Sequence, residues 1–118
     1  MLPLSPSAKL LITGPASDSL RQLSGGWSYT WLGAPDDSYF SGRGISILSG
    51  FQKLSSGKIT HVDTSPEEII AMSGDYDAIV VCVGEEPYTE FEGDINNMYL
   101  PSSQLKLLDT LIEQSNNL

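Results

Sequence analysis

Five carboxylates lie close together in the second half of the chain, between residues 85 and 94. No Lys or Arg separates them, and they directly follow an apolar run at residues 78–83 (AIVVCV) that ends at Gly84. Like charges this close repel one another, which tends to raise the pKa of at least one carboxyl group and favours a role in proton donation. The alternative is an ordinary solvated acidic loop. The carboxylates are Glu85, Glu86, Glu90, Glu92 and Asp94.

The apolar run is the element that must position these carboxylates. An unbroken series of β-forming residues is typical of a strand buried on both faces, as in a parallel sheet covered by helices. In open α/β sheets, ligands bind at the carboxyl ends of the strands. We therefore expect the acidic loop to lie where such folds place their chemistry.

A second unusual segment, residues 24–33 (SGGWSYTWLG), contains both tryptophans of the chain, Trp27 and Trp31. Its glycines allow sharp turns, and its composition indicates a loop rather than a periodic element. Flat aromatic faces presented from a loop suit the stacking of sugar rings or other planar ligands. The alternative is that each tryptophan covers a sheet edge.

Charge and composition narrow the classes of partner. The 118 residues carry a formal charge of −9 with six basic residues, which disfavours nucleic acid and anionic membrane surfaces. The first residues lack the features of a signal peptide, and no segment is long and apolar enough to cross a membrane. The remaining partners are neutral or cationic, such as sugars, metal ions or another protein.

Metal and thiol chemistry have weaker support. Cys82 is the only cysteine and lies within the apolar run, so it is interpreted as a small buried hydrophobe. His61, the only histidine, is interpreted as a structural or surface residue rather than a general base. The acidic loop could bind Ca²⁺, but it lacks the alternating ligand spacing and turn glycine of a calcium loop. We predict no metal site and no cofactor.

The remaining pattern predicts an α/β fold: a three-layer α/β/α sandwich whose sheet is mostly parallel and has about three strands. Residues 1–8 are expected to be a linker, followed by a partial domain at 9–118. Strands are predicted at 9–13, 59–62 and 78–83. Helices are predicted from a cap at Ser17 and Asp18 to Leu23, at 45–54 with Ile45, Leu48 and Phe51 on one face, at 65–73, and at 102–114.

A three-stranded sheet of this kind leaves an unpaired edge and bare apolar surface. The order of elements stops where a further strand is expected, which indicates an incomplete sheet. We therefore predict self-association into a homo-oligomer, either by pairing of exposed edges or by swapping of elements between copies.

Four segments together resemble the C-terminal α/β sandwich domain of glycoside hydrolase family 3 β-glucosidases. They are KLLITGPASDSL, SGGWSYTWLG, YDAIVVCVGEEPYTEFEGD and LPSSQLKLLDTLI, and the resemblance covers nearly the whole chain. The motifs GGW-x-x-x-W and GE-x-P-x-x-E are specific in combination. The resemblance implies that an N-terminal (β/α)₈ barrel, absent from this chain, supplies an aspartate nucleophile, and that the active site lies between the two domains.

The resemblance also implies roles for individual residues. Glu90, the last glutamate of GE-x-P-x-x-E, corresponds to the general acid/base, while Glu85 and Tyr88 are expected to order the loop. Trp31, together with Trp27, resembles the aromatic wall of the leaving-group subsite. Other branches of the family place the acid/base elsewhere, including in the barrel.

The implied function is that of a fragment of a retaining β-glucosidase, acting on a β-glucoside or a β-glucan oligosaccharide together with the barrel. Retaining glycosidases need two carboxylates about 5 Å apart, and this chain is expected to supply one of them. We therefore predict that the chain alone does not hydrolyse glycosides. The alternative is a stand-alone carbohydrate-binding or protein-interaction module without catalysis.

Overall fold

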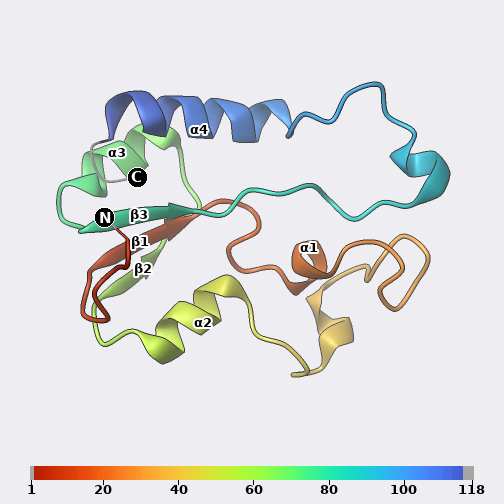
Figure 1. Cartoon of the computed structure of the whole chain (residues 1–118), viewed down its shortest axis with the longest axis horizontal. Coiled ribbons are helices and arrows are strands. Elements are labelled where there is room, and N and C mark those ends of the chain that lie inside the picture. The colour runs from red at the N-terminus through yellow and green to blue at the C-terminus, as the bar shows by residue number, and fades with distance from the viewer. Residues whose placement is uncertain (1, 116–118) are drawn as a thin grey trace.

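The computed structural model describes residues 2–115 and contains a parallel three-stranded sheet within them (Figure 1). The strands are β1 (Leu10–Thr13), β2 (Ile59–His61) and β3 (Ala78–Val81), in the spatial order β2-β1-β3. The α-helices are α1 (Leu20–Ser24), α2 (Ile47–Leu54), α3 (Pro66–Ser73) and α4 (Ser102–Gln114). Two short 3₁₀ helices, η1 (Asp37–Phe40) and η2 (Glu90–Gly93), lie in the long connections.

Helices cover both faces of the sheet, so that helices, sheet and helices form three layers (Figure 1). Leu10 and Ile12 of β1 pack with Leu48 of α2 on one face. Leu11, the residue between them, packs with Ile69 of α3 and Leu111 of α4 on the opposite face. This alternation follows from the period of two of a strand, and it confirms the predicted three-layer α/β arrangement.

Helix α3 begins as its sequence predicts. Ser65 accepts a hydrogen bond from the Glu68 amide, the Glu68 carboxylate accepts one from the Ser65 amide, and Pro66 occupies the first turn. This reciprocal capping box satisfies two backbone donors that the helix cannot satisfy itself. The local sequence is therefore sufficient to place the start of this helix.

Helix α1 starts later than predicted, because the expected caps are engaged elsewhere. The buried Ser17 hydroxyl donates to the Gly14 carbonyl oxygen, and Asp18 accepts a hydrogen bond from Ser46. Ser19 is the actual cap, and the distant Asp37 accepts hydrogen bonds from the Leu20 and Arg21 amides.

Other boundaries also differ from the prediction: β1 begins at Leu10 rather than Lys9, and β2 ends at His61 rather than Val62. Helix α2 begins at Ile47 with Ser46 as its cap, so Ile45 lies outside the helix and is exposed instead of sharing its buried face. Strand β3 ends at Val81, two residues before the end of the apolar run, although the Cys82 amide still donates to the Thr13 carbonyl oxygen of β1. Cys82 nevertheless remains buried.

The N-terminal segment, expected to be a linker, contacts the domain in the part that is described. Ala8 is buried in the cluster on the α2 face, and Leu4 packs against it. The Pro6 carbonyl oxygen accepts hydrogen bonds from the Ser56 and Gly57 amides after α2. Within residues 2–115, no helix combines the length and the hydropathy needed to span a membrane.

Candidate functional site

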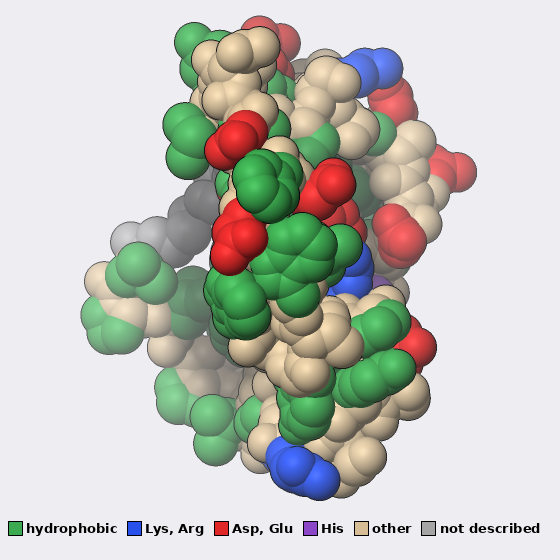
Figure 2. Space-filling model, turned by 90° about the vertical axis from the view of Figure 1, so that its right-hand side faces the viewer, with side chains coloured by type: hydrophobic (Ala, Val, Ile, Leu, Met, Phe, Trp, Pro, Cys, Tyr) green, Lys and Arg blue, Asp and Glu red, His purple; other side chains and the backbone are tan. Residues whose placement is uncertain are grey.

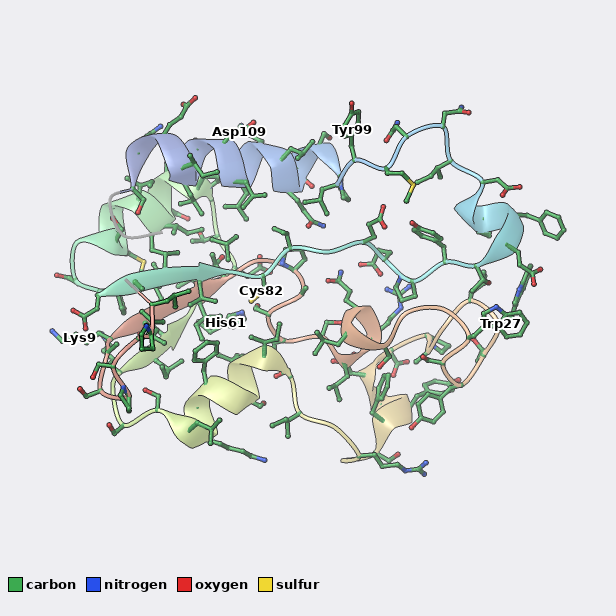
Figure 3. All side chains as sticks on the ribbon, in the orientation of Figure 1. Lys9, Trp27, His61, Cys82, Tyr99 and Asp109 are labelled. Carbon is green, nitrogen blue, oxygen red and sulfur yellow. The ribbon has the colours of Figure 1, made fainter. Side chains whose placement is uncertain are left out.

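Two loops extend beyond the carboxyl ends of the strands and lie at one end of the molecule (Figure 1). The aromatic loop, residues 25–33, follows α1. The acidic loop, residues 84–94, follows β3 and includes η2. Trp27 and η2 lie at the same end, while His61 and Cys82 lie beside the sheet (Figure 3). The two segments singled out by residue type are thus neighbours in space.

A hydrogen bond joins the two loops directly. The Thr89 hydroxyl donates to the Trp31 carbonyl oxygen at 2.9 Å. Gly26 allows this approach, because a Cβ atom there would overlap the Thr89 methyl carbon and lie 2.5 Å from the Tyr88 carbonyl oxygen. Only a glycine permits such backbone contact without displacement of the neighbouring loop.

Three residues of these loops adopt backbone conformations that side chains rarely take. Trp27, Tyr29 and Glu90 have φ values of 59°, 67° and 49°, in the left-handed region. Non-glycine residues are held there only where surrounding contacts determine the fold of the loop, and such residues cluster at functional sites. The backbone therefore points to the same two loops as residue type does.

Glu90, the predicted acid/base, is the first residue of η2, and its side chain is exposed. Among the described residues its carboxylate has no hydrogen-bond or ion-pair partner. It is therefore accessible to a molecule approaching this end of the domain.

Glu86 differs from Glu90 because it is neutralised by a basic partner from another part of the chain. The Arg21 guanidinium of α1 forms an ion pair with it, and the Gln22 side-chain amide donates to it at 2.7 Å. Arg21 Nε also donates to the Ala34 carbonyl oxygen at 3.0 Å, directly after the aromatic loop. Arg21 thus links α1 to both loops, although no basic residue lies near the carboxylates in sequence.

Glu85 and Tyr88 lie within the acidic loop and contact each other. The Tyr88 hydroxyl donates to Glu85 Oε2 at 2.8 Å. This hydrogen bond to a carboxylate is the main reason why the pKa of Tyr88 is raised above its ordinary value, with lesser contributions from desolvation and the charge of Glu85. A Cβ at Gly93 would lie 2.8 Å from the Tyr88 ring, so the ring packs against η2.

The two indoles are available at the surface. Trp27 is 69% exposed and Trp31 is 41% exposed. Tyr29, between them, makes edge-to-face contacts with Tyr39 and Phe40 of η1, with ring centroids 6.2 and 5.2 Å apart. Figure 2, which views this end of the molecule, shows hydrophobic side chains interspersed with carboxylates.

Cys82 and His61 are not part of this end of the molecule (Figure 3). Burial raises the pKa of the Cys82 thiol, which disfavours the reactive thiolate. His61 Nε2 lies 2.9 Å from the Ser17 hydroxyl. Among residues 2–115, no three His, Cys, Asp or Glu side chains are grouped in a way that would hold a metal ion.

Sequence reasoning missed Thr89, Arg21 and Gln22. Thr89 lies inside the GE-x-P-x-x-E motif, so its position next to Glu90 was the one available signal. Arg21 and Gln22 are separated from Glu86 by more than half of the chain, and their residue types alone do not indicate the pairing.

The model of the glycosyl hydrolase family 3 C-terminal domain matches residues 1–118, the full length of the chain. The chain belongs to this family. A lysosomal β-glucosidase of Dictyostelium discoideum is 34% identical over 129 aligned positions, which include 96% of this chain and 16% of the relative. The chain therefore spans about a sixth of the length of that curated relative.

Solved structures of family members have the same fold. An exo-1,3/1,4-β-glucanase from a Pseudoalteromonas species is 30% identical with a TM-score of 0.75, over 95% of this chain and 14% of the enzyme. A β-glucosidase from Listeria innocua in complex with glucose has a TM-score of 0.76 over 98% of this chain and 16% of that chain. Its identity of 22% supports the fold alone.

Proposed function

We propose that this chain is part of a retaining β-glucosidase that hydrolyses terminal β-D-glucosides or β-glucan oligosaccharides. Glu90 acts as the general acid/base, and Trp31 with Trp27 forms the wall of the leaving-group subsite. The observation that carries the proposal is the exposed Glu90 carboxylate on a loop hydrogen-bonded to the loop of both tryptophans. The names of two relatives, a β-glucosidase and an exo-glucanase, agree with this substrate class.

The chemistry assigns two steps to Glu90. In the first, its carboxyl group protonates the departing glycosidic oxygen while a nucleophilic carboxylate attacks the anomeric carbon. In the second, the Glu90 carboxylate removes a proton from the water that releases the glucose. The indoles hold the departing sugar by stacking, which orients its oxygen toward the acid.

The second carboxylate has to come from outside this chain. We assign it to the aspartate of the N-terminal barrel found in the family, with the active site between that barrel and this loop end. Glu85 and Tyr88 order the acidic loop through their mutual hydrogen bond. Without the nucleophile, the isolated chain has only one of the two carboxylates that the reaction needs, so it does not turn over glycosides.

The experiment uses a chimera in which this chain replaces the matching segment of the Pseudoalteromonas exo-glucanase. Glu90→Gln in the chimera should lower kcat/KM about 100- to 10,000-fold for disaccharides, whose departing oxygen needs a proton. The loss should be far smaller for 2,4-dinitrophenyl β-D-glucoside, whose leaving group departs unprotonated. Glu92→Gln is the matched control, because it also removes one negative charge from the same 3₁₀ helix, η2.

The possible results separate the roles of Glu90 and of the barrel. Equal losses from Glu90→Gln and Glu92→Gln, or a Glu90→Gln loss independent of the leaving group, would contradict the role of Glu90. Turnover of an aryl β-glucoside by the isolated chain would contradict the need for a barrel. The expected selective loss supports the assignment of general acid to Glu90.

We propose in addition that the isolated chain forms homo-oligomers through the free edge of β3. Within the described residues β3 pairs only with β1. An apolar groove runs along it, lined by residues 78–81, Leu2, Leu4 and Leu108. Unpaired backbone groups beside apolar surface favour strand addition from a second copy.

A further inference from the structure

Thr89 occupies the cap position of η2 but does not cap it. Its backbone is extended, with φ −148° and ψ 152°, as expected of a residue that precedes a helical turn. A threonine hydroxyl there ordinarily accepts a hydrogen bond from the backbone of the following turn. Here no such bond forms, and the hydroxyl donates across to Trp31 of the aromatic loop instead.

The acceptor of this bond is itself part of the fold of the aromatic loop. The Trp31 carbonyl oxygen also accepts a hydrogen bond from the Trp27 amide at 3.1 Å, the bond that closes the turn between the two indoles. A carbonyl oxygen has two lone pairs, so Thr89 and Trp27 together satisfy it. The Thr89 hydroxyl thus bonds to the atom that determines how Trp27 and Trp31 are placed.

The donor of this bond is buried and the contact is tightly packed. Thr89 is 8% exposed, so its hydroxyl has little access to water as an alternative partner. The approach of Gly33 to Pro87, where a Cβ would lie 2.8 Å from the Pro87 side chain, adds a second close contact between the loops. The loops therefore cannot slide past each other freely.

We propose that Thr89 is a positioning residue that sets the placement of Glu90 relative to the two indoles and thereby determines which leaving groups are protonated efficiently. Glu90 follows Thr89 directly and is held in the left-handed region, so displacement of Thr89 displaces the acid. The proposal rests on the proposed function of Glu90. It adds a residue that contacts neither substrate nor reacting atoms.

The test compares Thr89→Val and Thr89→Ser in the exo-glucanase chimera. Valine keeps the shape of threonine but cannot donate, whereas serine keeps the hydroxyl. Thr89→Val should lower kcat/KM for disaccharides about tenfold, because the acid and the stacked sugar are misaligned, and should raise KM as well as lower kcat. The kcat/KM for 2,4-dinitrophenyl β-D-glucoside, which reports formation of the glycosyl-enzyme, should change less than about twofold, and Thr89→Ser should restore most of the disaccharide activity.

A second measurement on the isolated chain follows the contact itself. Hydrogen exchange of the amides in residues 25–33 should accelerate in Thr89→Val, while exchange in β1 and β3 stays unchanged. Thr64→Val, at an exposed threonine of another loop, should have neither effect. This control shows whether a threonine-to-valine substitution by itself accelerates hydrogen exchange in residues 25–33.

Equal losses for both substrates, or failure of Thr89→Ser to restore activity, would assign Thr89 a purely structural role and overturn the proposal. Faster exchange without a kinetic change would overturn it as well. If Glu90→Gln had no selective effect, the proposed function of Glu90 would fail, and the proposal for Thr89 would fail with it. If Glu90→Gln had the selective effect and Thr89→Val did not, only the proposal for Thr89 would fail.

Discussion

At the scale of single residues, the carboxylates of the acidic loop differ in whether they have a partner within the protein. Glu86 is paired with Arg21, and Glu85 accepts a hydrogen bond from the Tyr88 hydroxyl, whereas Glu90 is exposed and unpaired among the described residues. A loop that is uniformly acidic in sequence is therefore not uniform in structure. The bonded carboxylates hold the loop, and Glu90, Glu92 and Asp94 remain exposed.

The Tyr88–Glu85 hydrogen bond gives a pH-dependent prediction. The pKa of Tyr88 is raised on folding, so its contribution to stability is fully present below the pKa of an unfolded tyrosine, about 10, and is lost as the pH rises through the higher folded value. Tyr88→Phe should therefore reduce the stability of the isolated chain at about pH 7 to 9, and the difference from the unsubstituted chain should shrink above about pH 10.

Urea unfolding at several pH values measures this effect. Tyr99→Phe is the control, because Tyr99 is 75% exposed and should show no such pH dependence. A deficit for Tyr88→Phe that stays constant from about pH 7 to above about pH 10 would show that the hydroxyl proton does not matter.

Residue type singled out the acidic loop and the two tryptophans, and only the family resemblance singled out Glu90 within that loop. Their common location depends on Thr89, Gly26 and Arg21, whose contacts join segments far apart in sequence. No local pattern encodes such contacts. The roles of Glu90, Trp31 and Trp27 remain proposals that the kinetic experiments decide.

At the scale of elements, the sequence predicted correctly those features that depend only on residues within the element itself. The alternation of strands and helices predicted the parallel three-layer fold, and Ser65 with Glu68 predicted the start of α3. The predicted start of α1 was wrong because Ser17 and Asp18 form hydrogen bonds elsewhere. The first turn of the helix instead depends on Asp37, which lies in the 3₁₀ helix η1.

The free edge of β3 gives a prediction at this scale. The isolated chain should self-associate, and association should strengthen with added salt, because screening reduces the repulsion between copies that each carry −9. Leu2→Asp, at a residue 84% exposed in the groove, should weaken association. Leu54→Asp, at an 85% exposed residue at the end of α2, should not.

Sedimentation velocity over a range of protein and salt concentrations distinguishes these outcomes. A monomer at all concentrations would rule out pairing through β3. Equal effects of the two leucine substitutions would indicate association through general hydrophobic exposure rather than through this edge.

At the scale of the whole molecule, this chain accounts for about a sixth of the length of a relative named as a β-glucosidase. Its sheet positions two hydrogen-bonded loops at one end, one with the exposed Glu90 and the other with two exposed indoles. Under the proposed function, this surface is half of a retaining active site, and a barrel supplies the nucleophile at this end of the domain.

Azide rescue tests the central claim most directly. In the exo-glucanase chimera, Glu90→Ala removes the base, so release of the glycosyl-enzyme should limit turnover of 2,4-dinitrophenyl β-D-glucoside. Azide needs no base and fits the space left by the carboxylate. It should accelerate turnover and yield β-D-glucosyl azide, whereas Glu92→Ala should give no azide product. Absence of acceleration by azide in Glu90→Ala, or its appearance in Glu92→Ala instead, would contradict the assignment of Glu90 as the acid/base.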